Sequence, residues 1–461
     1  MMPEPVLALG LDLGSTRIKA GLFASDGSLI RLASCDSPPL RRAGAICEGD
    51  AQDHIDAALG LLETLADEID EGLAAGLSCQ RSSFVLQDHA GRAVTPMISW
   101  QDTRAADWCR RNANFEPEFH RLTGLMLSAH YVGPKLAAMG EADTGMAAAL
   151  RRGEVRLRTL DTLLIERWGG TPSTDPSMAA RTGLFDIERL AWSKTLCTKF
   201  GVDLDCLPQV RPSDGLDCPT AQGAVFRSSL ADQSAGLVGF TGADTNTLLI
   251  NLGTGGFVLR PIDEPSSRLR GYLTGILRAD RGTPPLYALE GAISGCGPAI
   301  DRYRSGSPVL ERQDPAQDLF AIPDGAGLGS PHWRPEIGVT FSRPESSIDR
   351  EAAHRALLEG LLFRVREIYD DLTSSDRAEH IALAGGLSAE PFVAQGLATL
   401  LGQAVERIDA TEVTLRGAAI AACDGIRPAT PAATRYEPDD AGAYLKGKYS
   451  RWRDWLATLL G

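Results

Sequence analysis

The chain has 461 residues, of which 43% are hydrophobic and 23% are charged, and its formal net charge is −14. Because a net-negative surface is not attracted to polyanions, this composition argues against binding to nucleic acid or to an anionic membrane. The length exceeds what one compact core normally supports, and it therefore predicts two domains.

The first hundred residues have the pattern of a sheet with one covering helix. An apolar run over 6–12 and an alternating pattern over 17–22 predict two strands around a short turn. Asp26-Gly27 predicts a hairpin turn before a third strand over 28–33. Apolar residues recurring near one face predict a helix over 53–71. A strand over 76–78 and a hairpin that returns to Trp100 are predicted next.

The second half of the chain repeats this order. An apolar strand over 248–252, a turn of glycines and a return strand over 257–260 have the same arrangement as the first strands. The repetition predicts two related α/β domains that face each other. The remaining pattern predicts helices over 349–374, 391–401, from 414 onward and over 441–460, with a strand over 381–384.

The cysteines and the first residues favour a cytoplasmic protein. None of the nine cysteines forms a C-x-x-C pair, so reduced thiols are expected rather than disulfides or a zinc site. Residues 1–8 lack the basic region of a signal peptide. No run of about 18 apolar residues occurs, and no membrane-spanning helix is expected.

Two glycine turns are the strongest candidates for chemistry. Gly14-Ser15-Thr16 follows Asp12, and Gly253-Thr254-Gly255 occupies the same strand–turn–strand setting in the second half. Such turns expose backbone N–H groups that can bind phosphate oxygens, and two on opposed domains could hold a triphosphate from both sides. The GxxxxGK[ST], GxGxxG, HExxH and GxSxG motifs are absent, so other nucleotide folds, zinc proteases and serine hydrolases have no support.

The order of motifs along the whole chain resembles one family. The matching segments are 9–16, Ser99-Trp100-Gln101-Asp102-Thr103-Arg104, Thr123-Gly124-Leu125 with Lys135-Leu136, 251–255, Tyr287-x-x-Glu290-Gly291, 327–333, 338–340 and Ala384-Gly385-Gly386. In this order they resemble the FGGY carbohydrate kinases, the sugar and polyol kinases of the actin-like ATPase superfamily. The resemblance implies two actin-like (ribonuclease H-like) α/β domains with a nucleotide and substrate cleft between them, at residues 1–228 and 229–461.

The resemblance also assigns roles to single residues. Asp232 fits the position of the family's general base, ahead of Gly253, while Asp244 is a competitor placed closer to that turn. A carboxylate there accepts the proton of a sugar hydroxyl as the hydroxyl attacks the γ-phosphate. Asp12 is the expected partner of hydrated Mg²⁺, since this cation prefers carboxylate and water ligands. The expected ATP-binding residues are Gly14, Ser15, Thr16, Gly253, Thr254, Gly255, Gly385, Gly386 and Glu390.

The expected substrate pocket differs from that of glycerol kinases at two positions. Arg81, Trp100, His130, Asp232 and Gln233 are its predicted lining. Ser82 replaces a glutamate of glycerol kinases, and His130 falls at the position of a tyrosine. Because a pocket built for particular hydroxyls is sensitive to such changes, a different small polyol or ketose is favoured over glycerol. A glycerol kinase proper and a catalytically silent sugar sensor are the alternatives. Because the resembled family commonly forms dimers, a homodimer is also expected.

Overall fold

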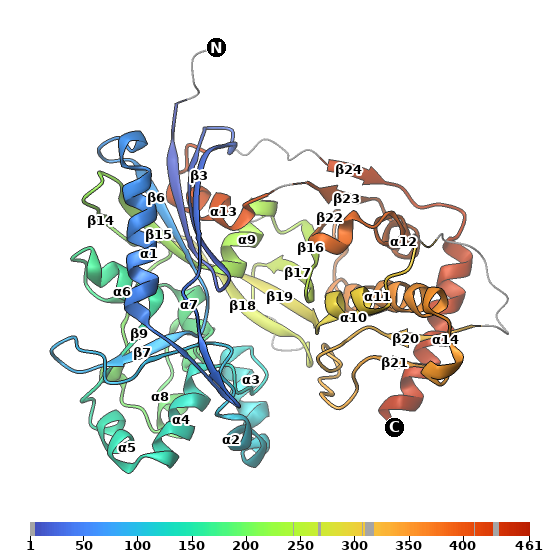
Figure 1. The fold of residues 1–461 in the computed structure, drawn as a ribbon, viewed down its shortest axis with the longest axis horizontal. Coiled ribbons are helices and arrows are strands. Elements are labelled where there is room, and N and C mark those ends of the chain that lie inside the picture. The colour runs from blue at the N-terminus through green and yellow to red at the C-terminus, as the bar shows by residue number, and fades with distance from the viewer. Residues whose placement is uncertain are drawn as a thin grey trace.

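The computed structural model describes residues 5–242, 244–265, 269–306, 308, 318–409, 411–426 and 433–461. The chain forms two lobes, each with its own central sheet (Figure 1). We call residues 5–231 the N-lobe and residues 232–461 the C-lobe. This arrangement confirms the mixed α/β fold with two facing domains that the sequence predicts.

The N-lobe sheet has the spatial order β14-β15-β6-β1-β2-β3. Its strands are β1 (Ala8–Leu13), β2 (Arg17–Phe23), β3 (Leu29–Asp36), β6 (Ala74–Cys79), β14 (Cys218–Pro219) and β15 (Val225–Ala231). β1 pairs antiparallel with β2 and parallel with β6. Helices α1 (Ala51–Thr64) and α6 (Leu160–Arg167) pack their apolar faces into the same core.

The C-lobe sheet repeats this pairing in the order β18-β19-β17-β16-β22-β23-β24. Its strands are β16 (Thr247–Leu252), β17 (Gly256–Ile262), β18 (Leu273–Arg278), β19 (Leu286–Ile293), β22 (His380–Ala384), β23 (Val405–Ile408) and β24 (Ala433–Tyr436). β16 pairs antiparallel with β17 and parallel with β22, as β1 does with β2 and β6. The predicted repeat of the strand–turn–strand unit is therefore confirmed.

A second sheet with its own helices extends the N-lobe. Its order is β4-β5-β8-β7-β9. The strands are β4 (Arg41–Ala43), β5 (Ile46–Gly49), β7 (Phe84–Gln87), β8 (Met97–Ile98) and β9 (Arg156–Thr159). The accompanying helices are α2 (Ala106–Arg111), α3 (Glu116–Thr123), α4 (Val132–Ala142), α5 (Thr144–Arg151) and α8 (Lys194–Phe200). Apolar side chains from β7, β8, β9 and these helices form a separate core.

Helices α10 (Cys296–Tyr303), α11 (Arg350–Leu372), α12 (Pro391–Leu401) and α14 (Gly442–Leu460) build the C-lobe core. The C-terminal helix α14 packs on its own lobe, as its amphipathic pattern predicts. Its Trp452 is fully buried and donates a hydrogen bond from Nε1 to the carbonyl oxygen of Ala321 at 3.0 Å. The remaining short elements are α7 (Pro176–Ala180), β10 (Ser173–Thr174), β11 (Phe185–Asp186), β12 (Ala191–Trp192), β13 (Gln209–Val210), β20 (Ala321–Ile322) and β21 (Thr340–Phe341).

Helices α9 (Asp232–Thr241) and α13 (Val413–Ala422) lie between the two sheets (Figure 1). α13 belongs to the C-lobe in sequence but packs Leu415 and Ala419 on Ala8 and Phe23 of the N-lobe. β15 continues the N-lobe sheet past residue 228 to Ala231. The domain limits 1–228 and 229–461 stay a prediction, since the chain crosses between the lobes more than once.

The first predicted helix is wrong at its C-terminal end. α1 begins after Asp50, whose side chain accepts a hydrogen bond from the backbone N–H of Gln52, and it ends at Thr64 rather than at residue 71. Asp67 and Glu68 follow in a separate 3₁₀ turn. Acidic side chains at a helix C-terminus interact unfavourably with the helix dipole. The spacing of apolar residues, on which the predicted helix end depended, contains no information about this charge effect.

All nine cysteines are free. Among the described residues, none of the helices is both long and apolar enough to cross a bilayer.

Candidate active site

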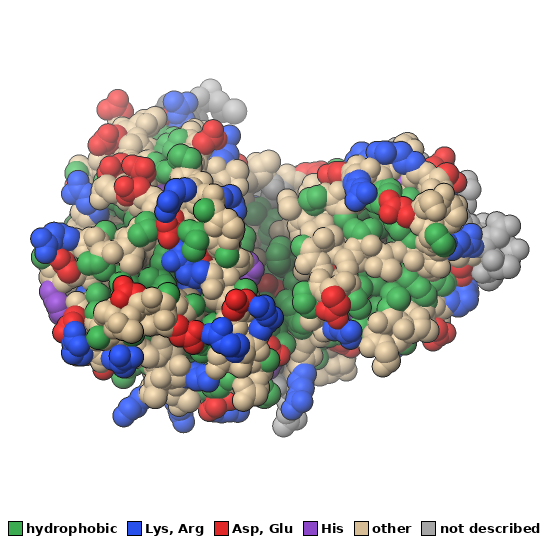
Figure 2. Space-filling model, turned by 60° about the horizontal axis from the view of Figure 1, so that its bottom comes forward, with side chains coloured by type: hydrophobic (Ala, Val, Ile, Leu, Met, Phe, Trp, Pro, Cys, Tyr) green, Lys and Arg blue, Asp and Glu red, His purple; other side chains and the backbone are tan. Residues whose placement is uncertain are grey.

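A pocket of about 320 Å³ opens between the two lobes, where the surface is deeply hollowed (Figure 2). Its lining includes all five residues predicted to contact substrate, Arg81, Trp100, His130, Asp232 and Gln233. Ser15 of the first glycine turn reaches the same pocket, so the predicted substrate and phosphate sites adjoin. Residues from both lobes contribute, which makes the pocket sensitive to how far apart the lobes stand.

Asp232 is the first residue of α9 and lies at the junction of the lobes. Its side chain is 35% exposed, and its Oδ1 atom accepts a hydrogen bond from the backbone N–H of Gln233 at 2.8 Å. The Nε atom of Arg81 lies 3.2 Å from the same Oδ1. The competitor Asp244 lies outside the pocket and accepts hydrogen bonds from Thr247 Oγ1 and the N–H of Asn246. Of the two competing carboxylates, Asp232 lines the pocket and Asp244 does not.

Charged side chains that the sequence analysis gave no role also line the pocket. Arg181 is 8% exposed and forms a buried ion pair with Glu290 of β19, across the lobe boundary. The desolvation of Glu290 is outweighed by Arg181 and Arg81, so its pKa is lowered. Burial and the neighbouring Arg181 lower the pKa of Arg81, and Asp232 opposes this shift. The pocket lining therefore contains two guanidinium groups and two carboxylates, those of Arg81, Arg181, Asp232 and Glu290.

Lys135 holds in place the two segments that carry Trp100 and His130 at the pocket. Its buried Nζ atom donates to the carbonyl oxygens of Ser99 at 2.7 Å, His130 at 3.0 Å and Trp100 at 3.3 Å. Burial lowers the pKa of Lys135 to about 7. The T-G-L…K-L motif thereby acquires a physical role, because one lysine holds both Trp100 and His130 at the pocket.

The imidazole of His130 has a defined tautomer in its neutral form. Its Nδ1 atom lies 3.1 Å from the carbonyl oxygen of Trp100, and a carbonyl can only accept, so Nδ1 carries the proton. The Nε2 atom is then an acceptor. Desolvation beside the pocket lowers the pKa of His130, although the residue as a whole is exposed; the hydrogen bond to the Trp100 carbonyl oxygen opposes this shift, and the charge of Lys135 adds to it.

The tyrosine expected from glycerol kinases has a counterpart one residue away. Tyr131 lines the pocket beside His130, although the motif spacing placed His130 at that position. Burial raises the pKa of its phenol, while Arg181 lowers it. Ser82, the residue in place of the glutamate, has φ of 63° and donates from Oγ to the carbonyl oxygen of Arg181 at 2.6 Å. Ser82 therefore ties the two arginine segments together instead of presenting a carboxylate.

The two predicted phosphate turns occupy equivalent positions in the two sheets. Gly14, Ser15 and Thr16 connect β1 to β2, and Gly253, Thr254 and Gly255 connect β16 to β17. The side chains of Ser15, Thr16 and Thr254 are exposed. A Cβ on Gly14 would lie 2.7 Å from the carbonyl oxygen of Arg17, so the first turn has no room for a side chain.

The predicted adenosine segment lies next to the second phosphate turn. Gly385 has φ of +88°, and a Cβ there would lie 2.4 Å from the carbonyl oxygen of Leu252 at the end of β16. Gly386 has open space where a Cβ would be. Glu390 precedes α12, and its carboxylate forms an ion pair with Arg304. Gly386 thus borders open space, Gly385 packs closely on the end of β16, and the Glu390 carboxylate already has a protein partner.

Asp12 is a buried carboxylate that accepts a hydrogen bond from one neighbouring hydroxyl. Its Oδ1 accepts from Ser78 Oγ at 2.8 Å. Burial raises its pKa to about 7, with Asp232 and Glu412 adding to the increase and Ser78 and Lys19 opposing it. Within the described residues there is no cluster of three or more His, Cys, Asp or Glu that could hold a metal. A single carboxylate fits Mg²⁺, which keeps several waters and is shared with substrate phosphates.

Comparison with known proteins places this geometry in a family. The model for the N-terminal domain of the FGGY family of carbohydrate kinases matches residues 7–224, and the model for the C-terminal domain matches residues 248–424. Glycerol kinase of Xanthobacter autotrophicus is 30% identical, and the match covers 98% of this chain and 99% of that protein. Glycerol kinase of Methylobacterium nodulans is also 30% identical, with 99% and 98% covered.

Solved structures agree with the fold. Plasmodium falciparum glycerol kinase with ADP superposes with a TM-score of 0.87 at 20% identity, covering 98% of this chain and 97% of the other. Ligand-bound xylulose kinase from Lactobacillus acidophilus has a TM-score of 0.86 at 19% identity and covers 98% of both chains. The chain belongs to the FGGY family of carbohydrate kinases. It is an ATP-dependent phosphotransferase that acts on an alcohol group of a small sugar or polyol.

Proposed function

We propose that the acceptor is a polyol or ketose longer than glycerol, phosphorylated on the hydroxyl nearest Asp232. The observation that carries this proposal is the pocket of about 320 Å³, in which Asp232 and Arg81 meet beside the rings of Trp100 and His130. An aromatic face packs on the carbon chain of a sugar, while charged groups bond its hydroxyls. Ser82 supports a longer acceptor, because it occupies less space than the glutamate expected there.

In this mechanism Asp232 accepts the proton of the attacking hydroxyl as the hydroxyl oxygen bonds to the γ-phosphorus. The bond from that phosphorus to the β–γ bridging oxygen breaks at the same time, and ADP leaves with its electron pair. Arg81 orients the Asp232 carboxylate and binds a neighbouring substrate hydroxyl. The backbone N–H groups of the turns 14–16 and 253–255 bind phosphate oxygens, and Gly385 and Gly386 border the adenosine space. Asp12 would hold Mg²⁺ through its waters, and the ion would neutralise charge on the phosphates. Approach of the lobes excludes water, which would otherwise compete as acceptor.

An ADP-release assay with Mg-ATP tests the proposal. The panel should contain glycerol, xylitol, ribitol, D-xylulose, D-ribulose and gluconate. We expect the highest kcat/KM with one of the five-carbon or longer acceptors. Highest kcat/KM with glycerol would reject the longer acceptor. Bound ATP without ADP release from any acceptor would instead favour the silent sugar sensor.

Glycerol is the second candidate acceptor, and two observations favour it. The curated relatives at 30% identity over nearly the whole chain are glycerol kinases. Tyr131 also provides a phenol at the pocket, one residue from its expected position. The same panel separates the two acceptors, since it compares kcat/KM values on one enzyme preparation.

The cellular location and the oligomeric state of the protein are also part of this proposal. Nine free cysteines and a nucleotide co-substrate support action in the cytoplasm. The homodimer implied by the family resemblance stays a prediction, and size-exclusion chromatography with light scattering tests it.

A further inference from the structure

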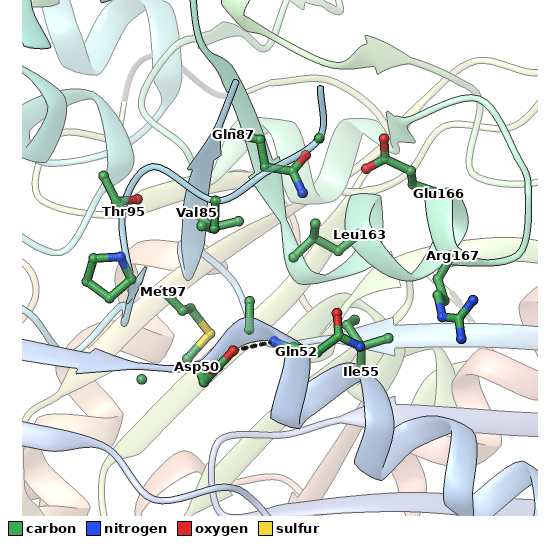
Figure 3. A pocket seen from close by; sticks show the side chains of 15 residues that line it. Asp50, Gln52, Ile55, Val85, Gln87, Thr95, Met97, Leu163, Glu166 and Arg167 are labelled. Carbon is green, nitrogen blue, oxygen red and sulfur yellow. Dashed lines mark hydrogen bonds between the residues drawn. The ribbon is translucent and has the colours of Figure 1, made fainter. Parts of the chain in front are cut away.

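A second cavity lies in the N-lobe, away from the substrate pocket. Its volume is about 510 Å³, and it is enclosed by the start of α1, the end of α6 and the β7–β8 hairpin (Figure 3). It shares no lining residue with the pocket that contains Asp232. Its size falls in the range of small-molecule sites, and the proposed kinase mechanism makes no use of it.

One wall of this cavity carries side-chain oxygen atoms that could accept further hydrogen bonds. Gln87 is 9% exposed, and its side-chain oxygen Oε1 has no hydrogen-bond partner. Figure 3 shows its amide directed toward the cavity, with Glu166 on the same side. Oε2 of Glu166 lies 3.3 Å from Nε of Arg158, and the Glu166 side chain is 36% exposed. A buried hydrogen-bond acceptor without a donor raises the free energy of the folded protein. A ligand that donates a hydrogen bond to Gln87 Oε1 would remove this cost.

The opposite side of the cavity carries a cation. Arg167 is exposed at the end of α6, and in the described part of the chain its guanidinium has neither an ion pair nor a hydrogen bond. Figure 3 shows Glu166 and Arg167 leaving the end of α6 on different sides of the helix, with Leu163 one turn earlier on the same helix. The first turn of α1 does not attract an anion by itself, because Asp50 already caps it and Asp53 is acidic.

An apolar surface joins the two polar sides. Ile55, Val85 and Met97 are buried and line the cavity together with Leu163. We propose that this cavity binds a linear zwitterion, with its ammonium group toward Gln87 and Glu166, its carboxylate toward Arg167 and an aliphatic chain on the apolar surface. This ligand satisfies the unpartnered oxygen and the unpaired guanidinium together, and it adds no net charge.

The cavity is connected to the substrate pocket through two strands. β7 follows Arg81 in the chain, and β8 leads into Trp100. The backbone N–H of Trp100 donates to Ser83 Oγ at 3.1 Å, which joins the two ends of the hairpin. Val85 and Met97 line the cavity from these same strands. We therefore expect occupancy of the cavity to change the KM for the acceptor.

Calorimetric titration of the full chain tests the site directly. The probes are 4-aminobutanoate, 5-aminopentanoate and 6-aminohexanoate, with pentylamine and pentanoate as compounds that carry only one of the two charges. We expect at least one amino acid to bind at least tenfold more tightly than either control. Absence of binding by all three, or equal binding by pentylamine or pentanoate, overturns the proposal.

Two variants assign the binding to this cavity. Gln87→Leu and Arg167→Gln should each weaken the best probe at least tenfold, while Arg121→Gln, an exposed arginine on α3, should leave it unchanged. Gln87→Leu removes an oxygen atom that has no hydrogen-bond partner, so the thermal unfolding midpoint of this variant should not fall. An unchanged midpoint would show that weaker binding does not result from misfolding. Unchanged affinity in both variants overturns the site. An unchanged acceptor KM with the probe bound overturns the connection to the substrate pocket. Because binding is measured without turnover, the result is independent of the proposed acceptor.

Discussion

At the scale of single residues, Asp232 carries the chemistry of the proposed reaction. Its carboxylate has a fixed orientation through Gln233 and Arg81, and it faces the pocket that both lobes enclose. No second pocket carboxylate is free for the same role, since Glu290 is committed to the buried ion pair with Arg181. The rate should therefore depend on Asp232 far more than on any neighbouring acid.

Asp232→Asn should lower kcat by about 10²–10⁴-fold, because the amide cannot accept the proton of the attacking hydroxyl. ADP release at saturating acceptor measures this loss. Asp244→Asn is the matched control, since asparagine also caps a turn and Asp244 lies outside the pocket. Equal kcat values for the two variants would contradict the assignment of the base.

His130 predicts a pH dependence of acceptor binding. The pKa of His130 is lowered from 6.5, so its ring is neutral at pH 7 and Nε2 can accept from a substrate hydroxyl. Protonation at pH values below this lowered pKa turns Nε2 into a donor and should raise the acceptor KM. KM measured from pH 8 to pH 5 tests this. The His130→Asn variant should flatten the rise, whereas His89→Asn on the exposed hairpin turn should not.

The residues that could be predicted from sequence are those within short motifs. Arg81, Trp100 and Asp232 were each assigned from their chain neighbours, and all three line the pocket. Arg181 carried no such signal, because its partner Glu290 lies 109 positions away and meets it only when the lobes pack. Glu290 stood inside a recognised segment, but a segment does not reveal which way a side chain points.

At the scale of elements, buried charge joins the C-terminal helix to the C-lobe. Lys448 of α14 is 1% exposed, and its Nζ atom lies 2.7 Å from Oε2 of Glu359 on α11. Burial raises the pKa of Glu359, and Lys448 opposes this shift. Amphipathic spacing predicted that α14 packs locally, but it could not predict which polar residue enters the core. The FGGY model ends at residue 424, so this helix lies beyond the matched segment.

Lys448→Met should lower the free energy of unfolding by about 3–5 kcal/mol, because it leaves the Glu359 carboxylate buried without its cation. Chemical denaturation measures the change. The double variant Lys448→Met/Glu359→Leu should recover most of the loss, since it removes the buried charge as well. The same loss in the double variant would show that packing, and not charge, is the main contribution of Lys448.

At the scale of the whole molecule, glycines let helix α13 approach both α9 and the N-lobe sheet closely. A Cβ on Gly417 of α13 would lie 1.8 Å from the carbonyl oxygen of Ala235 in α9, and one on Gly76 of β6 would lie 1.8 Å from that of Ala418. The backbone of α13 is thereby held against both α9 and the N-lobe sheet. Sequence patterns predicted two domains and a helix here, but not that a C-lobe helix fills the junction. Close backbone approach leaves no periodic signal other than the glycines themselves.

Gly417→Ala should therefore damage the junction that carries Asp232. The added methyl group overlaps the Ala235 carbonyl, so the helices must separate, at a cost of about 1–3 kcal/mol in stability. Because α9 begins at Asp232, the same shift should also lower kcat/KM. Gly60→Ala on α1 is the control, since nothing lies within 4 Å of its Cβ position and alanine should stabilise that helix by about 0.5–1 kcal/mol. Thermal unfolding and ADP release measure both variants, and a Gly417→Ala protein as stable and active as the parent would contradict a tightly packed junction.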